Sequence, residues 1–168
     1  RRHSFPTRRS SDLLALAAGH AGQRRHRDGA VWVELAAIND PALLVTVVAQ
    51  ALGLPSNAEA PLASLVVGLK PLNVLLVLDN AEHLLEAVAA LVKAIVEAAP
   101  EVRVLVTSQM ALKVPGEQVF RLNALSVPEH GASTEEALSH GAVALFVDQA
   151  QAADRRFLLI DSNVAMVI

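Results

Sequence analysis

One run of the sequence, VLLVL at residues 74–78, is apolar at every position and leads directly into Asp79. A strand with one face in water alternates apolar and polar residues, so five apolar residues in a row indicate a strand that is buried on both faces. Such strands belong to parallel sheets that helices cover from both sides. An acid that follows such a strand lies at the carboxyl edge of the sheet, where open α/β folds bind their ligands.

The rest of the chain alternates between strand and helix patterns. Further strands are expected at residues 30–35, 102–107 and 119–122. Helices are expected at residues 13–21, 41–52, 61–69, 82–99 and 135–153. Strands separated by helices form βαβ units, and their right-handed crossovers make the sheet parallel. The expected fold class is therefore α/β, with a parallel sheet sandwiched by helices.

The first twelve residues, RRHSFPTRRSSD, have neither a helical nor a strand period. They resemble a translated sequencing-adapter tail of the kind found in assembled genomic data. We therefore expect residues 1–12 to be a non-native tail and residues 13–168 to be the domain. A second basic cluster, RRHR at residues 24–27, follows the first helix, where cations complement a helix C-terminus. Nucleic-acid contact is the alternative role for this basic arm.

Several kinds of site are excluded by the sequence. The chain has no cysteine, which rules out disulfides and thiolate metal sites. It has no G-x-S-x-G and no G-x-G-x-x-G pattern, and its six histidines lack paired metal spacing. No apolar run approaches the ~20 residues that span a bilayer, so we expect no membrane partner and a cytoplasmic location.

The apolar run that ends in Asp79 is a Walker B pattern. In this pattern the acid holds Mg²⁺ on the nucleotide phosphates, usually through water. Many parallel strands end in an acid, however, and the alternative is that Asp79 caps the helix that follows.

Several segments resemble the STAND class of signal-transducing P-loop ATPases, close to the NB-ARC type. The stretch LVLDNAEHL at residues 76–84 is specific to this group. Supporting segments occur in the same order, namely WVELA at 32–36, VLVTS at 104–108, VPGE at 114–117 and ALFV at 144–147. The chain is most similar to the ATPase part of large bacterial transcriptional regulators, including LuxR-type and SARP-type proteins.

The resemblance implies a P-loop NTPase-like domain that uses ATP and Mg²⁺. It makes Asp79 the Mg²⁺-binding acid and places Asn80 where strongly hydrolytic relatives often have a glutamate base. It also implies that Glu82 or His83 assists through water, although capping of the next helix is an equal alternative. The resemblance further implies that three residues at the end of the sensor strand bind the nucleotide near its terminal phosphate. They are Thr107, Ser108 and Gln109.

The chain departs from this family in three places. It has no G-x-x-x-x-G-K-[ST] loop, which supplies the backbone N–H groups and the lysine that hold the phosphates. The strand before that loop, which sits in this class between those at 102–107 and 119–122, is missing too. Three contiguous strands are therefore expected, and the fourth, at 119–122, must close a gap or detach. Gln109 stands where the family usually has arginine, and the sequence stops before the helical segments of such regulators.

Three hypotheses for the function remain open. The preferred one is a fragment, cut at both ends, of an ATP-binding switch domain that does not hydrolyse ATP by itself. Its partners are then nucleotide and the other domains of the parent regulator, with DNA contacted only through an absent domain. The second is a degenerate α/β module for docking or oligomerisation. The third is an assembly artefact with no cellular role of its own.

Overall fold

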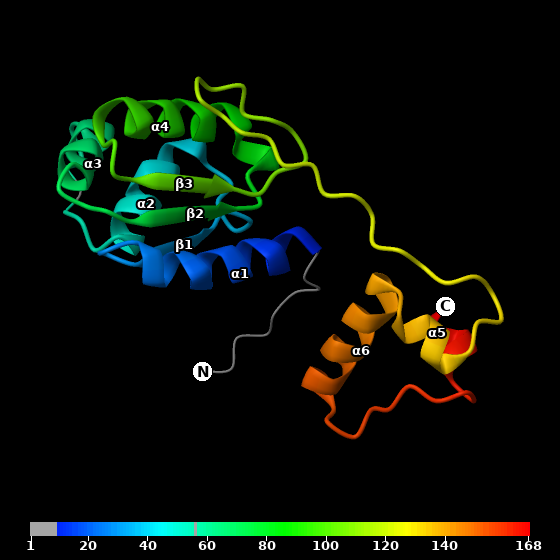
Figure 1. Cartoon of the computed structure of the whole chain (residues 1–168). Coiled ribbons are helices and arrows are strands. Elements are labelled where there is room, and N and C mark those ends of the chain that lie inside the picture. The colour runs from blue at the N-terminus through cyan, green and yellow to red at the C-terminus, as the bar shows by residue number, and fades with distance from the viewer. Residues whose placement is uncertain (1–9, 56) are drawn as a thin grey trace. The chain divides into compact units, whose positions relative to one another are not determined.

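The computed structural model describes residues 10–55 and 57–168 (Figure 1). The chain divides after Phe120 into two compact units, of which the second is Arg121–Ile168. Of the expected tail at residues 1–12, residues 1–9 lie outside the described residues. Residues 10–12 belong to the first helix, α1 (Ser10–Arg25).

The first unit is built on a three-stranded parallel sheet. Its strands are β1 (Ala30–Glu34), β2 (Leu75–Asp79) and β3 (Arg103–Val106), in the order β1-β2-β3. The prediction of a parallel α/β sheet with three contiguous strands is confirmed. Because the strands are parallel, their carboxyl ends meet at one edge, and Glu34 lies beside Asp79 there.

Within the described residues of this unit, the helical segments that accompany the sheet are α1 (Ser10–Arg25), η1 (Pro41–Leu43), α2 (Leu44–Ala51), α3 (Pro61–Leu69), η2 (Glu82–Leu84) and α4 (Leu85–Ala98). The sequence placed the start and end of the second helix correctly. Asp40 Oδ1 accepts a hydrogen bond from the Ala42 N–H at 2.9 Å, and Pro41 occupies the first helical position. Gly53, with a φ of 67°, follows the last turn of α2. No helix in the described part of the chain is long and apolar enough to cross a membrane.

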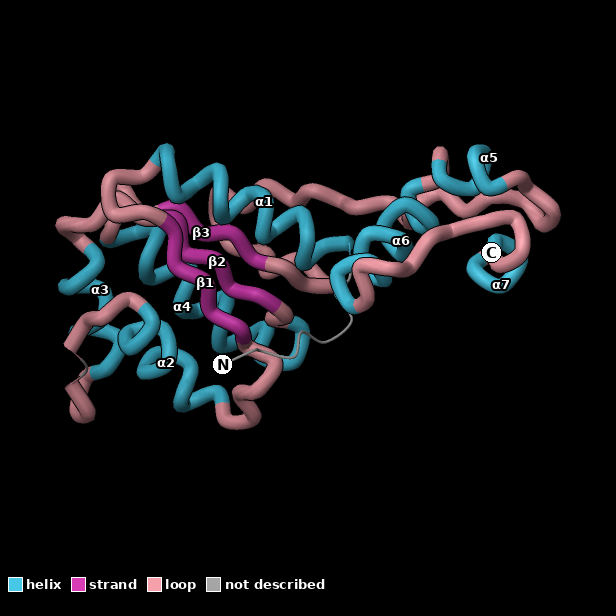
Figure 2. The backbone as a smooth tube through the Cα atoms, turned by 90° about the horizontal axis from the view of Figure 1, so that it is seen from below, coloured by secondary structure: helices cyan, strands magenta, loops and turns pink. Residues whose placement is uncertain are grey.

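The core lies between the sheet and one layer of helices. Alternate side chains of the strands, such as Val33, Leu76 and Leu78, are buried against α2, α3 and α4. Leu76 and Leu78 are both 0% exposed. Figure 1 shows α4 and α1 on opposite sides of the sheet, and Figure 2 shows the three strands from the side of α1.

Helix α1 covers the other face of the sheet and runs antiparallel to β2. A Cβ atom on Gly22 would meet Leu75 at the start of β2, whereas one on Gly19 would approach Val77, two residues further along. The prediction that the first helix ends at residue 21 is therefore wrong, because α1 continues to Arg25. Gly22 stays helical because its missing side chain lets the helix lie close against Leu75.

The two glycines of α1 give a matched pair of substitutions. A Cβ at position 22 would lie 2.3 Å from Leu75 Cδ2 and 3.3 Å from its Cβ, whereas at position 19 the nearest atom is 3.8 Å away. We expect Gly19→Ala to raise the free energy of unfolding by about 0.5–1 kcal/mol, through its helix propensity. Gly22→Ala gains the same propensity but overpacks the site, at a cost of about 1–3 kcal/mol. Urea denaturation of both variants measures the difference, and equal stabilities would contradict this packing.

The segment at residues 119–122 does not form the strand that its sequence predicts. No other strand pairs with it within residues 10–55 and 57–168, and residues 119–122 have no regular secondary structure. Phe120 is 80% exposed and Val119 is 57% exposed. A strand needs a hydrogen-bonded neighbour, and β-branched composition cannot supply one, so the prediction is wrong.

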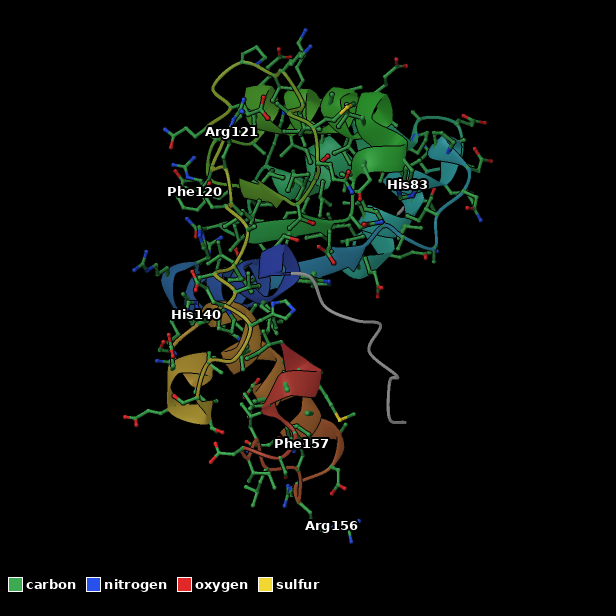
Figure 3. The ribbon with its side chains drawn as sticks, turned by 90° about the vertical axis from the view of Figure 1, so that its right-hand side faces the viewer. His83, Phe120, Arg121, His140, Arg156 and Phe157 are labelled. Carbon is green, nitrogen blue, oxygen red and sulfur yellow. The ribbon has the colours of Figure 1, made fainter. Side chains whose placement is uncertain are left out.

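The second unit is a small helical cluster with its own core. Its helices are α5 (Thr134–Leu138), α6 (Gly141–Ala153) and α7 (Val164–Val167), and Ala137, Val143 and Val164 are buried between them. Phe157, labelled in Figure 3, meets Phe146 of α6 edge-to-face with ring centroids 5.9 Å apart. The helix expected at 135–153 is interrupted, because Ser126 accepts hydrogen bonds from the N–H groups of Gly141 and Ala142 and so fixes a new helix start.

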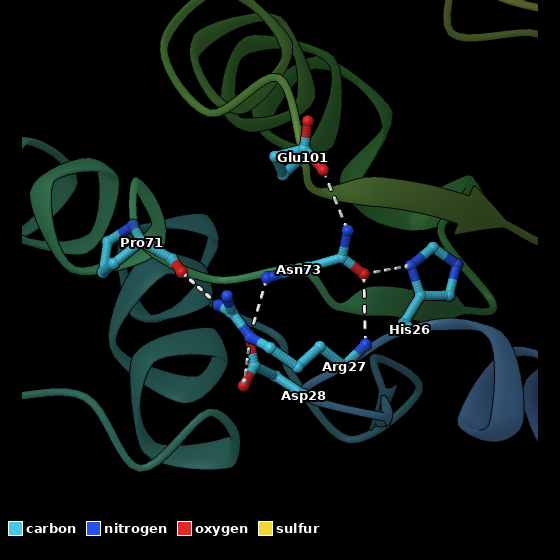
Figure 4. A network of polar contacts seen from close by, with 6 residues as sticks. All are labelled: His26, Arg27, Asp28, Pro71, Asn73 and Glu101. Carbon is cyan, nitrogen blue, oxygen red and sulfur yellow. Dashed lines mark hydrogen bonds and ion pairs between the residues drawn. The ribbon is translucent and has the colours of Figure 1, made fainter.

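A polar network joins the segments that enter the three strands (Figure 4). Asn73, just before β2, accepts a hydrogen bond from the Arg27 N–H and donates through Nδ2 to Glu101, which precedes β3. His26 Nδ1 lies 3.1 Å from Asn73 Oδ1. Asp28 accepts from the Asn73 N–H at 2.8 Å and pairs with Arg27 at 2.9 Å. The network fixes the amino edge of the sheet, opposite to the edge that carries Asp79.

Asp28 makes this network sensitive to acid. The hydrogen bonds from the Arg27 side chain and from the Asn73 N–H hold the pKa of Asp28 below its ordinary value. A carboxyl pKa that is lower in the folded state stabilises the fold at pH values above the unfolded pKa, and this contribution is lost as the pH falls. We expect the stability advantage of the wild type over Asp28→Asn to be constant above about pH 5 and to shrink below about pH 4. Thermal unfolding at several pH values tests this, and an advantage that persists unchanged at pH 2.5 would contradict it.

Candidate functional site

Three polar side chains end the three strands at the carboxyl edge. Glu34 and Asp79 are in register as the last residues of β1 and β2, and Thr107 follows β3 directly. Side chains alternate along a strand, so Asp79 lies on the same face as Leu75 and Val77, which is the face that α1 covers. This edge is where a parallel sheet presents groups to a ligand.

Thr107 connects Asp79 to the backbone of the residue after it. Its hydroxyl donates to Asp79 Oδ1, and its oxygen accepts the Asn80 N–H at 2.8 Å. The Thr107 carbonyl accepts the Ala81 N–H at 2.9 Å. A hydroxyl has one hydrogen to donate, and Thr107 donates it to Asp79. This hydrogen bond fixes the orientation of the Asp79 carboxylate.

Asn80 adopts a backbone conformation that few residues other than glycine accept. Its φ is 64°, in the left-handed region, where asparagine is among the better tolerated residues. This turn carries the chain from Asp79 into η2 and places the Asn80 N–H against Thr107. The structure thus brings together three of the site residues expected from the sequence, namely Asp79, Asn80 and Thr107.

The other predicted residues lie around this group. Gln109 Nε2 donates to Glu82 Oε1 at 3.4 Å, which joins the segment after β3 to the start of η2. Ser108 Oγ accepts the Met110 N–H at 3.2 Å. Glu82 and Gln109 are therefore paired with each other, and the Ser108 oxygen caps the local turn.

His83, labelled in Figure 3, anchors the loop after β1. Its Nε2 lies 3.1 Å from the Leu35 carbonyl oxygen and 3.0 Å from that of Ile38. Both partners only accept, so Nε2 carries the hydrogen and donates it. The Nε2 atom is therefore engaged with the backbone, and only Nδ1 could take part in chemistry through water.

The first turn of α1 lies toward the same edge as Asp79, because α1 runs antiparallel to β2. The N-terminus of a helix carries a partial positive charge and attracts anions. Among the described residues, no group of three or more His, Asp or Glu side chains could hold a metal ion. A cation at Asp79 would therefore take most of its oxygen ligands from water and a bound phosphate, as Mg²⁺ commonly does.

Sequence reasoning missed two features of this edge. The first is the hydrogen bond between Thr107 and Asp79, and the second is the position of Glu34 beside Asp79. A partial signal was present, because Asp79 and Thr107 each end a run of strand-like residues and Glu34 is the acidic residue next to the end of another. Their contact became visible only once the register of the strands was known.

The comparisons with known proteins point to bacterial regulators. The chain is 35% identical over 153 residues to a "Putative HTH-type transcriptional regulator" of Mycobacterium tuberculosis and, equally, to one of Mycobacterium bovis. The match covers 90% of this chain and 16% of each relative. An "Uncharacterized protein" of Mycobacterium tuberculosis is 31% identical over 156 residues, which are 92% of this chain and 37% of that protein.

No family profile matches the chain, and no solved structure is significantly similar to it. The chain spans about a sixth of the length of the regulators that it matches. It is therefore homologous to a small part of mycobacterial proteins that are named as HTH-type transcriptional regulators.

Proposed function

We propose that this chain carries the Mg²⁺-binding edge of an ATP-operated switch domain in a transcriptional regulator. The observation that carries the proposal is the carboxylate of Asp79, which Thr107 holds in place at the carboxyl edge of a parallel sheet. This is the position in which P-loop NTPases of the STAND class, which the sequence resembles, hold their Walker B acid. The similarity to part of an HTH-type regulator agrees with such a role.

In this proposal Asp79 binds Mg²⁺ through water, and the metal bridges to the phosphates of ATP. The amino end of α1 lies toward the same region, where the helix dipole favours the phosphate charge and Asp12, an acid in the first turn, opposes it. Asn80 stands beside Asp79 and has no acidic group, so it cannot act as a base. The sequence also has no glycine-rich phosphate loop, so the proposed role of this chain is weak binding without turnover.

Other domains of the regulator are the proposed partners of the switch. Binding of ATP and Mg²⁺ would change how this domain packs against them, because a ligand shifts an equilibrium toward the state that it binds more tightly. Contact with DNA is assigned to a separate domain.

Paramagnetic broadening by Mn²⁺-ATP tests the proposal, because Mn²⁺ takes the same oxygen ligands as Mg²⁺. We expect the amide signals of Asn80 and Ser108 to broaden and that of Asn73, at the opposite edge of the sheet, to stay sharp. The effect should be lost in Asp79→Asn, which keeps the shape and the acceptor oxygen but removes the charge. Broadening that is absent, or that survives in Asp79→Asn, would favour a docking module instead.

A further inference from the structure

His83 connects the start of η2 to the loop that follows β1. The hydrogen on its Nε2 atom is shared between the carbonyl oxygens of Leu35 and Ile38, at 3.1 and 3.0 Å. His83 is an exposed residue, so burial of its ring does not explain this position. The hydrogen bonds from Nε2 are therefore what holds the ring against the loop.

Leu35 is held at both of its backbone groups by the segment that follows β2. Its N–H donates to the Asp79 carbonyl at 2.9 Å, and its carbonyl accepts from His83 Nε2 and from the Ile38 N–H. Between Asp79 and His83 the chain turns at Asn80, whose φ is 64°. The backbone of Leu35 and residues 79–83 thus form one closed ring at the carboxyl ends of β1 and β2.

The turn after β2 is also tied to β3. The Asn80 N–H donates to Thr107 Oγ1 at 2.8 Å, and the Ala81 N–H donates to the Thr107 carbonyl at 2.9 Å. Because β2 lies between β1 and β3, this turn is connected to both neighbouring strands. A ligand that moves or stiffens the turn at Asp79 therefore acts on the loop after β1 through His83.

That loop leads into the layer of helices. Ile38 is buried and belongs to the same core cluster as Leu44 of α2. Asp40 caps η1, which continues into α2 at Leu44. Helix α2 packs against α3 and α4. The hydrogen bonds of His83 thus stand between the carboxyl edge of the sheet and the helices on the face away from α1.

We propose that His83 is a positioning residue that couples ligand binding at Asp79 to the loop at residues 35–40. The coupling rests on the proposed function, because it needs Mg-ATP at Asp79. Two sites are coupled when both act on one element of the structure, and the ring of Leu35 and residues 79–83 is that element. His83 acts through Nε2 on the protein backbone and does not contact the nucleotide.

Two substitutions separate the two ring nitrogens of His83. Glutamine carries its amide nitrogen about as far from the backbone as Nε2, and asparagine carries its amide about as far as Nδ1. His83→Gln therefore keeps a donor for the Leu35 and Ile38 carbonyls, and His83→Asn removes it. A role of Nδ1 through water predicts the opposite order, with asparagine as the better replacement.

Hydrogen exchange of the full chain without nucleotide tests whether Nε2 holds the loop. The Ile38 amide reports on the loop, because it donates to the carbonyl that His83 also binds. We expect it to exchange about three- to tenfold faster in His83→Asn and at the wild-type rate in His83→Gln. The Val77 amide, in the middle strand, should not change. Equal Ile38 rates in the wild type and His83→Asn, or equal acceleration in both variants, would overturn the proposal.

The same measurement with Mg-ATP tests the coupling. We expect the Asn80 amide to slow in the wild type and in both variants, and the Ile38 amide to slow only in the wild type and His83→Gln. An Ile38 amide that slows equally in His83→Asn would overturn the coupling through His83. If Mg-ATP slowed the Asn80 amide in none of the three proteins, the nucleotide site would be wrong and the coupling with it. The exchange without nucleotide would then still decide whether His83 holds the loop.

Discussion

Replacing Leu76 by alanine lowers the free energy of unfolding by about 2–5 kcal/mol, because the side chain is fully buried and its removal leaves a cavity. Leu76 lies in the middle strand, is 0% exposed and packs among the side chains between the sheet and α4. Domains of this size have total stabilities of about 5–15 kcal/mol, so one such change removes a large fraction. Urea denaturation followed by Trp32 fluorescence reports on the first unit specifically, since Trp32 is in β1.

Leu14→Ala is the matched control for this experiment. Leu14 lies in α1, and its side chain is 47% exposed, so the same truncation should change the free energy of unfolding by less than about 0.5–1 kcal/mol. If both variants lost the same stability, the middle strand would not be the centre of the core.

Replacing Thr107 by valine removes a hydroxyl that serves two partners. Asp79 loses a hydrogen bond to a charged group, which contributes about 1.5–3 kcal/mol, and the Asn80 N–H loses its acceptor. The group is partly buried, so water compensates some of this loss. We expect a net destabilisation of about 2 kcal/mol, with faster hydrogen exchange at the Asn80 amide.

Thr107→Ser separates the hydroxyl from the shape of the side chain. Serine keeps the donor and the acceptor and loses only a methyl group, so Asn80 exchange should stay slow and the loss of stability should be about 1 kcal/mol or less. A valine variant that is as stable as the serine variant, with an unchanged Asn80 amide, would show that Thr107 does not hold Asp79.

The sequence predicted the sheet well because its signal is local. Five apolar residues before Asp79 indicate a strand that is buried on both faces, and β2 is that strand. The start of η1 was equally clear, because the Asp40 cap and Pro41 act within one turn. Features that depend on near neighbours in the chain were therefore available from the sequence.

The incorrect predictions share a different cause, which is dependence on distant residues. Glycine is typical of a helix end, but the close packing of Gly22 against Leu75 keeps this residue inside α1. The segment around Phe120 has the composition of a strand, but no strand pairs with it among the residues that the structure describes. Local propensity is a weak prior in both cases, and the tertiary neighbours decide the outcome.

The same distinction applies to the candidate site. Asp79 could be selected from the sequence because it ends a buried strand. The contact with Thr107 could not, because it depends on the register between β2 and β3.

Thermal unfolding of the full chain with and without Mg-ATP, compared with Asp79→Asn and Glu34→Gln, tests whether the edge at Asp79 binds nucleotide. A ligand at roughly ten times its dissociation constant adds about 1.4 kcal/mol to the native state, which corresponds to a rise in Tm of about 3–5 °C. We expect this rise in the wild type and in Glu34→Gln, which removes the neighbouring carboxylate, and we expect its loss in Asp79→Asn. A Tm that does not move with Mg-ATP, or that rises equally in Asp79→Asn, would contradict the assignment of this edge as a nucleotide site.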